Sequence, residues 1–520
     1  MILRRLFLSV LFIICFIFSL SCRTRSTEFV TIALSEKFST LDTLTSSASD
    51  AAAERVRSLM FNSLVKKNEK FDYVGDLAKE IQTSEDGKTI TFIIQDNVKF
   101  HNGKDFTSAD VKYTFDELFK SQSAYKAGSF FETVNDQKVP HINSIDTPDP
   151  KTVVFTVSRP ALKNKLLSNL VAVPIIAAGT IEQQKTQPIG TGAFKFVNFD
   201  QSQNIVELEA NPNYWEGAPK VQKIRVKTVP DANSLQAELQ SGGVDIVPLP
   251  TNLTPDTLKS LEQNPNLKVR QFNGSNIQYL QFNTQLSPLN NPKIRQAVGY
   301  AIDREKIINE LLFGQATIAY SILPVESWAY NAGTKINFDP AKAKQLIQQS
   351  GYKNEPIKYT YTAGNAAANQ YAQVIQNSLK EAGLNVQIDP LEGNVLREQL
   401  KLGQFQMNTG IWIGGNQDPI FLNDLFATSA IPGGKISCCN RSRYSNPEFD
   451  KIIDEALNTT DRDKAKELYF RAQEIVSNDL PMLPLWYPAN MVVYNKRIGN
   501  IKINSSGDWN FIKDITVESK

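Results

Sequence analysis

A helical pattern, a glycine and an alternating pattern follow one another in the second half of the chain. Residues 366–382 have helical spacing, Gly383 follows, and residues 384–388 alternate between apolar and polar side chains. Glycine is common just after a helix because it adopts the left-handed backbone conformation without steric cost. A helix that leads through a glycine into a strand is typical of an α/β fold. We therefore expect an α/β protein.

Other segments of the second half extend this α/β pattern. Apolar side chains recur at three- and four-residue spacing over residues 293–313, which predicts one long helix. Asp339 followed by Pro340 predicts the start of another helix, because Asp caps well and Pro is tolerated at the first helical position. Pro484 breaks the pattern before a final strand, which we expect at residues 487–494.

The first half contains more strand and hairpin signals. Residues 29–34 alternate like a strand, and residues 152–157 do the same. Asp86-Gly87 separates two strand-like stretches, and this dipeptide suits the positive backbone angles of a tight turn. Thr107 precedes a helical pattern and is expected to cap it.

The N-terminus has the pattern of an export signal. Arg4 and Arg5 precede the apolar run 6–17, which is shorter than the roughly 20 residues of a membrane span. Cys22 follows at the expected cleavage point, and this arrangement resembles the signal of bacterial lipoproteins. We expect lipidation of Cys22, while ordinary secretion and an uncleaved anchor stay open. In each case the rest of the chain works outside the cytoplasm, in the periplasm or at the outer face of the cytoplasmic membrane.

Length and charge limit the possible partners. A chain of 520 residues is expected to form two or three domains. It has 56 basic and 54 acidic side chains, and removal of Arg4 and Arg5 makes the two numbers equal. This balance argues against nucleic acid as a partner, because backbone binding requires clustered positive charge. After the signal there is no second long apolar run, so we expect contact with a membrane through a lipid anchor only.

Several stretches, in this order, resemble the signature motifs of one family. They are residues 75–80, 85–89, 98–103, 106–111, 190–194, 211–215, 279–283, 294–298, 301–304, 412–419 and 446–450. The family is that of the large solute-binding proteins of ABC importers, the peptide/nickel type called family 5. The resemblance extends over nearly all of the chain after the signal.

The resemblance implies the two-lobed periplasmic-binding-protein fold, an α/β fold with an additional domain inserted in the N-terminal lobe. Solute would lie between the lobes and be enclosed by hinge closure. The expected boundaries are 1–22 for the signal peptide, 23–60 and 185–271 for lobe I, 61–184 for the inserted domain, 272–484 for lobe II, and 485–520 for the return to lobe I.

The stretch from Trp412 to Pro419 carries the main candidates for ligand binding. Peptide-binding relatives have an Asp three residues after the Trp, which pairs with the α-amine of the peptide, and here that position is Gly415. A carboxylate facing an ammonium contributes about 1.5–3 kcal/mol, so the free amine need not be the recognised group here. Gly415 and Asn416 would bring backbone close to the solute. For Trp412, stacking on the ligand and packing in the core both stay open.

Asp418 is the nearest acid that could replace the missing Asp. It also precedes Pro419 and an apolar stretch, which is the pattern of a helix N-cap, and we favour capping over ligand contact. Asn276, before the first strand of lobe II, is a further candidate ligand contact. Ser46 and Ser47, after the first strand, are weaker candidates.

The sequence contains little that predicts a metal, cofactor or catalytic site. His101 and His141 are the only histidines, and neither His-x-x-His nor Cys-x-x-Cys spacing occurs, so we expect no metal site built by the protein and no cofactor. We expect no catalytic residues, although paired carboxylates of a glycosidase type stay open. Cys438 and Cys439 are adjacent, and they form either a strained vicinal disulfide or two thiols.

These observations together predict a monomeric receptor that binds a small solute, an oligopeptide in the first place, and delivers it to ABC permease subunits. The same role for a saccharide, an opine or a chelated metal stays open. The rival class is a tethered extracytoplasmic hydrolase. A receptor would return its solute unchanged, whereas a hydrolase would return product.

Overall fold

The computed structural model describes residues 28–518, except residues 38, 48, 49, 122, 135, 136, 161, 365 and 434–438. The predicted signal peptide, its lipidation residue Cys22, and Cys438 lie outside the described residues. Cys439 is disulfide-bonded, and the other three cysteines of the chain lie outside the described residues. Within the described ranges, every helix is too short or too polar to cross a bilayer.

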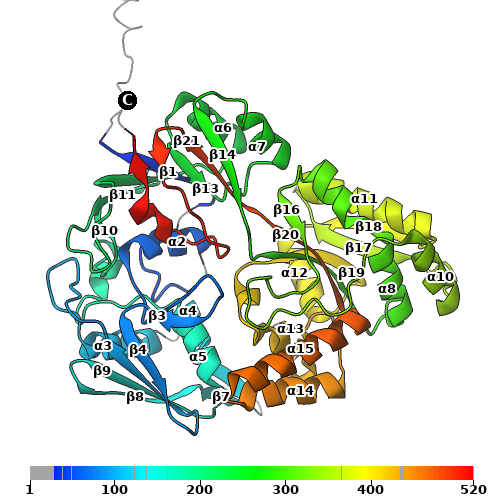
Figure 1. Ribbon diagram of the computed structural model, residues 1–520, viewed down its shortest axis with the longest axis horizontal. Coiled ribbons are helices and arrows are strands. Elements are labelled where there is room, and N and C mark those ends of the chain that lie inside the picture. The colour runs from blue at the N-terminus through cyan, green and yellow to red at the C-terminus, as the bar shows by residue number, and fades with distance from the viewer. Residues whose placement is uncertain are drawn as a thin grey trace, which may run out of the picture.

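Two large sheets form the centres of two lobes (Figure 1). Lobe I is built on a seven-stranded sheet of order β10-β11-β12-β1-β13-β21-β14. Its strands are β1 (Val30–Leu34), β10 (Phe194–Asp200), β11 (Ile205–Ala210), β12 (Lys223–Thr228), β13 (Ile246–Pro248), β14 (Leu267–Phe272) and β21 (Asn490–Asn495). β1 is parallel to β12 and β13, whereas β21 pairs antiparallel with β13 and β14.

Helices cover both faces of the lobe I sheet. α6 (Ala232–Ser241) and α7 (Pro255–Leu261) pack on one face, and α2 (Ala51–Met60) packs on the other. α2 ends at Met60, because Phe61 has extended backbone angles. Two short strands, β22 (Ile498–Gly499) and β23 (Thr516–Val517), and a 3₁₀ turn, Asn510–Asp514, follow β21.

The segment between α2 and β10 forms the predominantly antiparallel part of the molecule. Its four-stranded sheet has the order β4-β5-β9-β8, and β2–β3 and β6–β7 are separate hairpins. The elements are β2 (Val65–Lys67), β3 (Tyr73–Gly75), β4 (Ala78–Thr83), β5 (Thr89–Ile94), α3 (Ser108–Lys120), α4 (Tyr125–Gly128), β6 (Phe131–Val134), β7 (Gln137–Pro140), β8 (Ile142–Asp149), β9 (Thr152–Val157), α5 (Leu162–Leu170) and a 3₁₀ turn (Glu182–Lys185). One continuous hydrophobic core joins this segment to the α2 face of the lobe I sheet.

The local expectations for this segment are confirmed. Gly87 has φ +69° in the turn between β4 and β5. Thr107 caps α3 in a capping box with Asp110, whose carboxylate accepts the Thr107 backbone N–H at 2.9 Å.

Lobe II is built on a six-stranded sheet of order β16-β20-β15-β19-β17-β18. The strands are β15 (Ile277–Phe282), β16 (Ala316–Ile318), β17 (Ile357–Thr362), β18 (Val386–Leu391), β19 (Met407–Trp412) and β20 (Met482–Pro488). The helices are α8 (Pro292–Ala301), α9 (Arg304–Lys306), α10 (Pro340–Ser350), α11 (Ala366–Ala382), α12 (Gly393–Leu402), α13 (Phe421–Phe426), α14 (Pro447–Asn458) and α15 (Arg462–Asp479), with 3₁₀ turns at Gly415–Gln417 and Thr428–Ala430.

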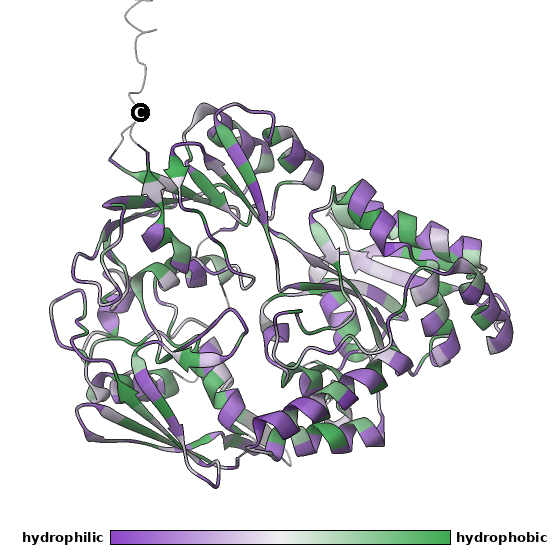
Figure 2. Ribbon diagram, viewed as in Figure 1, coloured by the Kyte–Doolittle hydropathy of each residue, from purple (hydrophilic) through white to green (hydrophobic). Residues whose placement is uncertain are grey.

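Lobe II has helices on both sides of its sheet. α8, α10 and α11 bury their apolar side chains on one face, and α13, α14 and α15 do so on the other. Figure 2 shows hydrophilic and hydrophobic residues interleaved along these outer helices, as expected for helices with one buried face. α11 has the predicted bounds, and Gly383 after it has φ +104°.

The long helix predicted over residues 293–313 is wrong. α8 ends at Ala301, because Ile302 has extended backbone angles. The carboxylate of Asp303 then accepts the backbone N–H of Lys306 at 2.9 Å and starts a new helical segment, α9, which passes into a π-helical turn at Ile307–Leu311. An Asp whose side chain competes for backbone donors favours a cap over a helix interior.

The single final strand predicted at residues 487–494 is also wrong, because this part of the chain belongs to two strands in two sheets. β20 ends at Pro488 in lobe II, and β21 begins at Asn490 in lobe I. Pro484 lies inside β20, where the pairing with β15 shifts register, so its missing N–H does not interrupt a regular ladder. The chain crosses between the sheets at residues 272–277 and 488–490. The lobe boundaries expected from the sequence stay predictions.

Candidate functional site

The two lobes touch where the loop after β19 meets the β2–β3 hairpin. The hydroxyl of Tyr73 in β3 donates a hydrogen bond to Oδ2 of Asp418 in lobe II. Lys67 Nζ, at the end of β2, donates to Oε1 of Gln417 at 3.1 Å. Arg462 at the start of α15 forms an ion pair with Asp72 of the same hairpin. We call this set of contacts the seam.

Asp418 has contacts on both sides of the seam. Its Oδ1 accepts the backbone N–H of Ile420 at 2.9 Å, so it caps the turn that leads into α13. Its Oδ2 accepts from Tyr73. Burial raises the pKa of this carboxyl, and the nearby Lys67 ammonium and the Tyr73 hydrogen bond oppose that rise. The predicted helix N-cap is wrong, because Ile420 is the N-cap of α13 and Asp418 accepts a backbone N–H in the turn before it. A ligand contact of Asp418 stays a prediction.

Side chains of both lobe II asparagines predicted as ligand contacts hold the 412–418 loop in place. Asn276 Oδ1 accepts the backbone N–H of Gly414 at 3.2 Å. Asn416 is fully buried, and its Nδ2 donates to the carbonyls of Ser275 at 2.6 Å and Ile322 at 2.9 Å. Gly415 lies in the 3₁₀ turn Gly415–Gln417 of the same loop. These contacts attach the loop to the first residues of lobe II.

Trp412 is the last residue of β19 and packs mainly against its own lobe. Its ring stacks on Tyr279 at a centroid distance of 6.3 Å and meets Phe421 edge-on at 5.0 Å. The guanidinium of Arg441 lies 5.6 Å from the ring centroid. Within the described part of the chain the indole Nε1 has no hydrogen-bond partner. The packing alternative is therefore present in the structure, and stacking on a solute stays a prediction.

Ser46 and Ser47 lie in the loop between β1 and α2, apart from the 412–418 loop. Ser46 lines a cavity of about 200 Å³ together with Lys126, while Ser47 is exposed. Lys126 is buried, and its Nζ donates to the Thr43 carbonyl at 2.7 Å and to Glu54 Oε1 at 2.5 Å. Burial lowers the pKa of Lys126 to about 8, although Glu54 favours its charged form.

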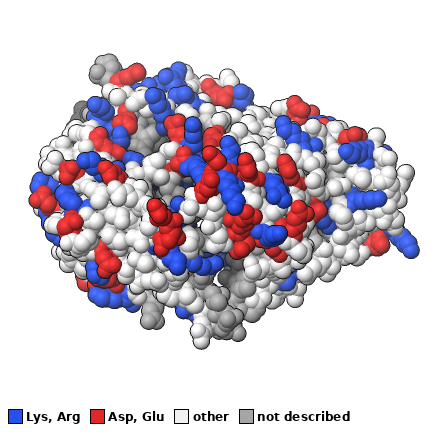
Figure 3. All heavy atoms as spheres, turned by 60° about the horizontal axis from the view of Figure 1, so that its bottom comes forward, with Lys and Arg blue, Asp and Glu red and all other residues white. Residues whose placement is uncertain are grey.

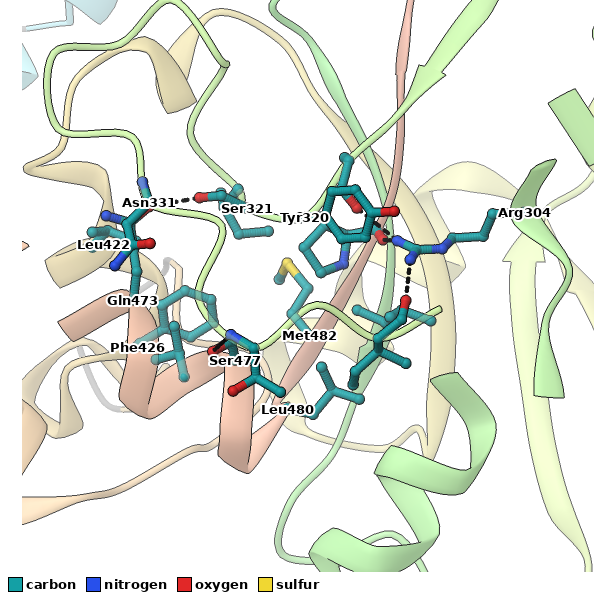
Figure 4. A pocket seen from close by; sticks show the side chains of 17 residues that line it. Arg304, Tyr320, Ser321, Asn331, Leu422, Phe426, Gln473, Ser477, Leu480 and Met482 are labelled. Atoms are coloured by element: carbon teal, nitrogen blue, oxygen red, sulfur yellow. Dashed lines mark hydrogen bonds between the residues drawn. The ribbon is translucent and has the colours of Figure 1, made fainter. Parts of the chain in front are cut away.

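The cavities of the structure differ in volume, and volume decides which of them has room for a solute. Solute pockets usually measure about 300–1,000 Å³. A cavity of about 730 Å³ lies between lobe I and Gln417 of lobe II, whereas cavities of about 200 and 120 Å³ border Ser46 and Asp418. A further cavity lies inside lobe II (Figure 4) and measures only about 30 Å³. That volume has room for about one or two water molecules.

The small cavity of Figure 4 is a packing gap with satisfied polar groups. Arg304 points its guanidinium at backbone carbonyls, including those of Ala319 at 2.6 Å and Pro484 at 2.7 Å. Gln473 accepts from Ser321 Oγ at 2.7 Å and donates to the carbonyl of Ala329 at 2.7 Å. These polar groups already have partners, so the cavity offers little to a solute.

The large cavity has a mixed apolar and polar lining. Its apolar and aromatic contributors include Phe61, Phe194, Tyr214, Phe511 and Ile503. Its acids include Asp76, which is buried and whose pKa burial raises to about 6 against the opposing charge of Lys66. A lining of this kind fits a solute that carries both apolar and charged groups.

The structure brings some predicted residues together and adds others. Asn276, Trp412, Gly415, Asn416 and Asp418 belong to one region of lobe II, and Ser46 and Ser47 lie on lobe I. Sequence reasoning missed Lys67, Tyr73 and Gln417, because a lysine or tyrosine in a short hairpin has no distinctive pattern. Among the described residues, no group of three or more His, Cys, Asp or Glu side chains is suited to a metal ion.

Comparison with known proteins identifies the family. The model of "Bacterial extracellular solute-binding proteins, family 5 Middle" matches residues 72–433. The chain belongs to this family. The extracytoplasmic receptor role in ABC import that the sequence predicts is therefore confirmed, as is the two-lobed fold. Members of the family are binding proteins that deliver small solutes to ABC permeases.

Relatives and solved structures match this family 5 protein over most of their length. The heme-binding protein A of Haemophilus influenzae is 28% identical over 464 residues, which are 84% of this chain and 83% of the relative. The dipeptide-binding protein of Escherichia coli is 28% identical over 488 residues, 88% and 89% of the two chains. The structure of the substrate-binding protein CtaP from Listeria monocytogenes aligns with a TM-score of 0.82 at 22% identity, over 94% of this chain and 99% of that one.

Proposed function

We propose that this family 5 protein encloses an oligopeptide-like solute in the cavity of about 730 Å³ and delivers it chemically unchanged to a membrane permease. The observation that carries the proposal is the position of this cavity. Lobe I supplies most of its lining, and Gln417 from lobe II closes one part of it. Separation of the lobes at the seam would remove that contact and open a route for the solute.

Relatives with known ligands support a peptide first. DppA from Helicobacter pylori, 26% identical with a TM-score of 0.71 over 94% of this chain, was solved in complex with the peptide STSA. NikZ from Campylobacter jejuni was solved with Ni(L-His), so the family fold also accepts a chelated metal. For this chain a saccharide, an opine or a chelated metal is the second candidate.

The deciding experiment is mass spectrometry of the solute released by denaturation from freshly purified protein. A peptide of a few residues supports the proposal, and a chelated metal or a sugar replaces it with the second candidate. The released solute is then incubated with the protein and measured again. An unchanged mass supports a receptor, and conversion to product would show a hydrolase.

Further parts of the proposal concern attachment and organisation. We propose that Cys22 carries the lipid that holds a monomer in the periplasm or at the outer face of the cytoplasmic membrane. The solute contacts expected from the sequence are Trp412, Gly415, Asn416, Asp418, Asn276, Ser46 and Ser47. They are not among the residues that line the large cavity, so they form a separate part of the proposal, and the lobe boundaries are those given above. Intact-mass analysis of the protein extracted from membranes tests the lipid, and Cys22→Ala should release the protein from the membrane fraction.

A further inference from the structure

Of the basic side chains that line the large cavity, two have no carboxylate partner among the described residues: Lys67 and the exposed Lys502. Arg57, Lys66 and Lys513 have carboxylate partners, at 2.5 Å for Arg57–Glu54, 2.6 Å for Lys66–Glu216 and 2.9 Å for Lys513–Asp514. Lys67 is half-buried, and among the described residues no carboxylate oxygen lies within 4 Å of its Nζ. Among the described residues, Lys67 Nζ donates one hydrogen bond, to the neutral amide oxygen of Gln417 at 3.1 Å.

The surroundings of Lys67 leave its charge incompletely satisfied. An ammonium has three donors, and a desolvated charge is costly unless it is paired and hydrogen-bonded. Burial lowers the pKa of Lys67, and the Asp418 carboxylate only partly opposes this effect without forming an ion pair. The carboxylate of Asp418 is itself engaged by Tyr73 and by the Ile420 backbone.

The backbone and the opposite lobe both fix the position of Lys67. It is the last residue of β2, where it pairs with Tyr73 of β3, so its backbone is held by the hairpin ladder. Gln417 is buried, and its Nε2 donates to Ser275 Oγ at 2.9 Å, which orients its amide oxygen toward Lys67. The indole Nε1 of Trp509, another residue that lines the cavity, has no hydrogen-bond partner among the described residues.

We infer that Lys67 is a specificity-determining residue that receives an anionic group of the solute, a carboxylate, at the part of the large cavity bordered by Gln417. This inference rests on the proposed function. A carboxylate there would supply the ion pair that Lys67 lacks, and the cavity would disfavour the same solute with that group neutralised. For a peptide, the carboxylate is either the C-terminus or an Asp or Glu side chain.

Matched peptide pools test this inference. Purified protein, stripped of solute by unfolding and refolding, is incubated with random tri- to pentapeptides without Asp and Glu, once as free acids and once as C-terminal amides. A third pool contains Asp and Glu as C-terminal amides. Retained peptides are identified by mass spectrometry, and their dissociation constants are measured by calorimetry.

The expected result is preferential retention of a pool that carries a carboxylate, by about 10- to 100-fold in affinity, as for a hydrogen bond to a charged group. Lys67→Met should abolish the preference between acid and amide, and Lys67→Arg should keep most of it. Retention of the first pool points to the C-terminus, and retention of the third to an acidic side chain.

Lys70→Met is the matched control, because Lys70 lies in the turn of the same hairpin, is exposed and is not among the residues that line the cavity. This variant should bind as the wild type does. The ratio of acid to amide affinity is a readout that a loss of stability alone would not change.

Equal retention of acids and amides by the wild type, or an unchanged preference in Lys67→Met, would overturn the inference while peptide binding stands. If the wild type retains none of the three pools, the peptide form of the proposed function fails, and the inference falls with it.

Discussion

At the scale of single residues, Asp418 links two parts of the chain that lie 345 residues apart. One of its oxygens belongs to a turn inside lobe II, and the other accepts from Tyr73 of lobe I. The first contact exists whether the lobes are open or closed, whereas the second requires closure. The Tyr73 hydroxyl also has a hydrogen bond with Ser168 of its own lobe, so its removal acts on closure and, to a smaller extent, on lobe I.

We expect Tyr73→Phe to weaken solute binding by more than it lowers the stability of the solute-free protein, where only the contact with Ser168 is lost. The variant removes a donor to a buried carboxylate, which is worth about 1.5–3 kcal/mol, and this loss affects only the closed form. Calorimetry with the released solute should show about a 10- to 100-fold higher Kd.

The control for this experiment is Tyr300→Phe, since the Tyr300 hydroxyl accepts from Lys342 within lobe II at 2.7 Å. A lower melting temperature of solute-free Tyr73→Phe, at unchanged affinity, would contradict the role in closure.

His101 predicts a pH dependence of stability. Burial lowers its pKa to about 4, and its Nε2 lies 3.0 Å from the carbonyl oxygen of Gly192. The unfolded chain takes up this proton near pH 6.5, whereas the folded protein does so only near pH 4. Acidification through this window therefore favours unfolding, and the stabilising contribution is complete above pH 6.5. Between pH 6.5 and pH 4 this effect lowers the free energy of unfolding by about 3 kcal/mol.

The measurement compares urea unfolding of the wild type and His101→Gln between pH 4 and 7. The difference in unfolding free energy should shrink by about 3 kcal/mol as the pH falls through the window. Asp76, whose pKa of about 6 favours the folded state on acidification, contributes to both proteins and cancels. A difference that stays constant with pH would mean that His101 does not titrate in this way.

At the scale of elements, the 412–418 loop is held by its asparagines. Asn416 was predicted as a ligand contact, yet its buried Nδ2 donates to two backbone carbonyls of lobe II. We expect Asn416→Ala to lower the unfolding free energy by about 2–4 kcal/mol, because two buried carbonyl groups lose their donor. Urea denaturation of the solute-free wild type and variant measures this difference in unfolding free energy.

Asn423→Ala, in α13 of the same region, is the comparison variant, since among the described residues Asn423 Nδ2 has a single, long contact of 3.4 Å to Asp424. If Asn416→Ala kept its stability and lost solute binding alone, the direct ligand contact predicted from the sequence would be the better interpretation.

Elements with local signals could be predicted from the sequence, and those decided by distant partners could not. The start of α10 at Asp339 and Pro340, the cap of α3 at Thr107 and the end of α11 before Gly383 all depend on neighbouring residues. The break after Ile302 was missed because apolar periodicity continues through it. Pro484 inside β20 was missed because a register shift in its partner strand accommodates it.

In the candidate site, too, residues close together in the sequence could be predicted, and contacts between distant residues could not. The motif around Trp412 identified the lobe II loop, because its residues are consecutive in sequence. The partners of that loop, Lys67 and Tyr73, are 350 and 345 residues away from Gln417 and Asp418, so only the folded chain reveals them. Burial also changes the interpretation of Asn416, and burial is a property of the tertiary structure.

At the scale of the whole molecule, the ion pair between Asp72 and Arg462 joins the two lobes at the seam. Figure 3 shows basic and acidic side chains interspersed over one face of the molecule, so a single reversed charge changes little in the overall field. We expect Arg462→Glu to place two acids opposite each other and to favour the open form. Small-angle scattering should then give a larger radius of gyration in the presence of solute.

The double variant Asp72→Arg with Arg462→Glu restores opposite charges and should return the radius of gyration toward the wild-type value. A double variant that stays as open as the single one would show that this ion pair does not contribute to closure.

The hydrophobic core that lobe I shares with the segment between α2 and β10 limits how the molecule can deform. Because that core has no internal boundary, the antiparallel segment cannot swing on its own, and it travels with the seven-stranded sheet as one solid part. The remaining freedom is concentrated where the chain passes twice between the sheets, and there Asn490 Nδ2 donates to the Asn273 carbonyl at 3.0 Å, which couples the two passages. The two lobes are thus two rigid bodies joined by one hinge. Because the seam and the hinge use different residues, substitutions can change the stability of the closed form and the stiffness of the hinge separately.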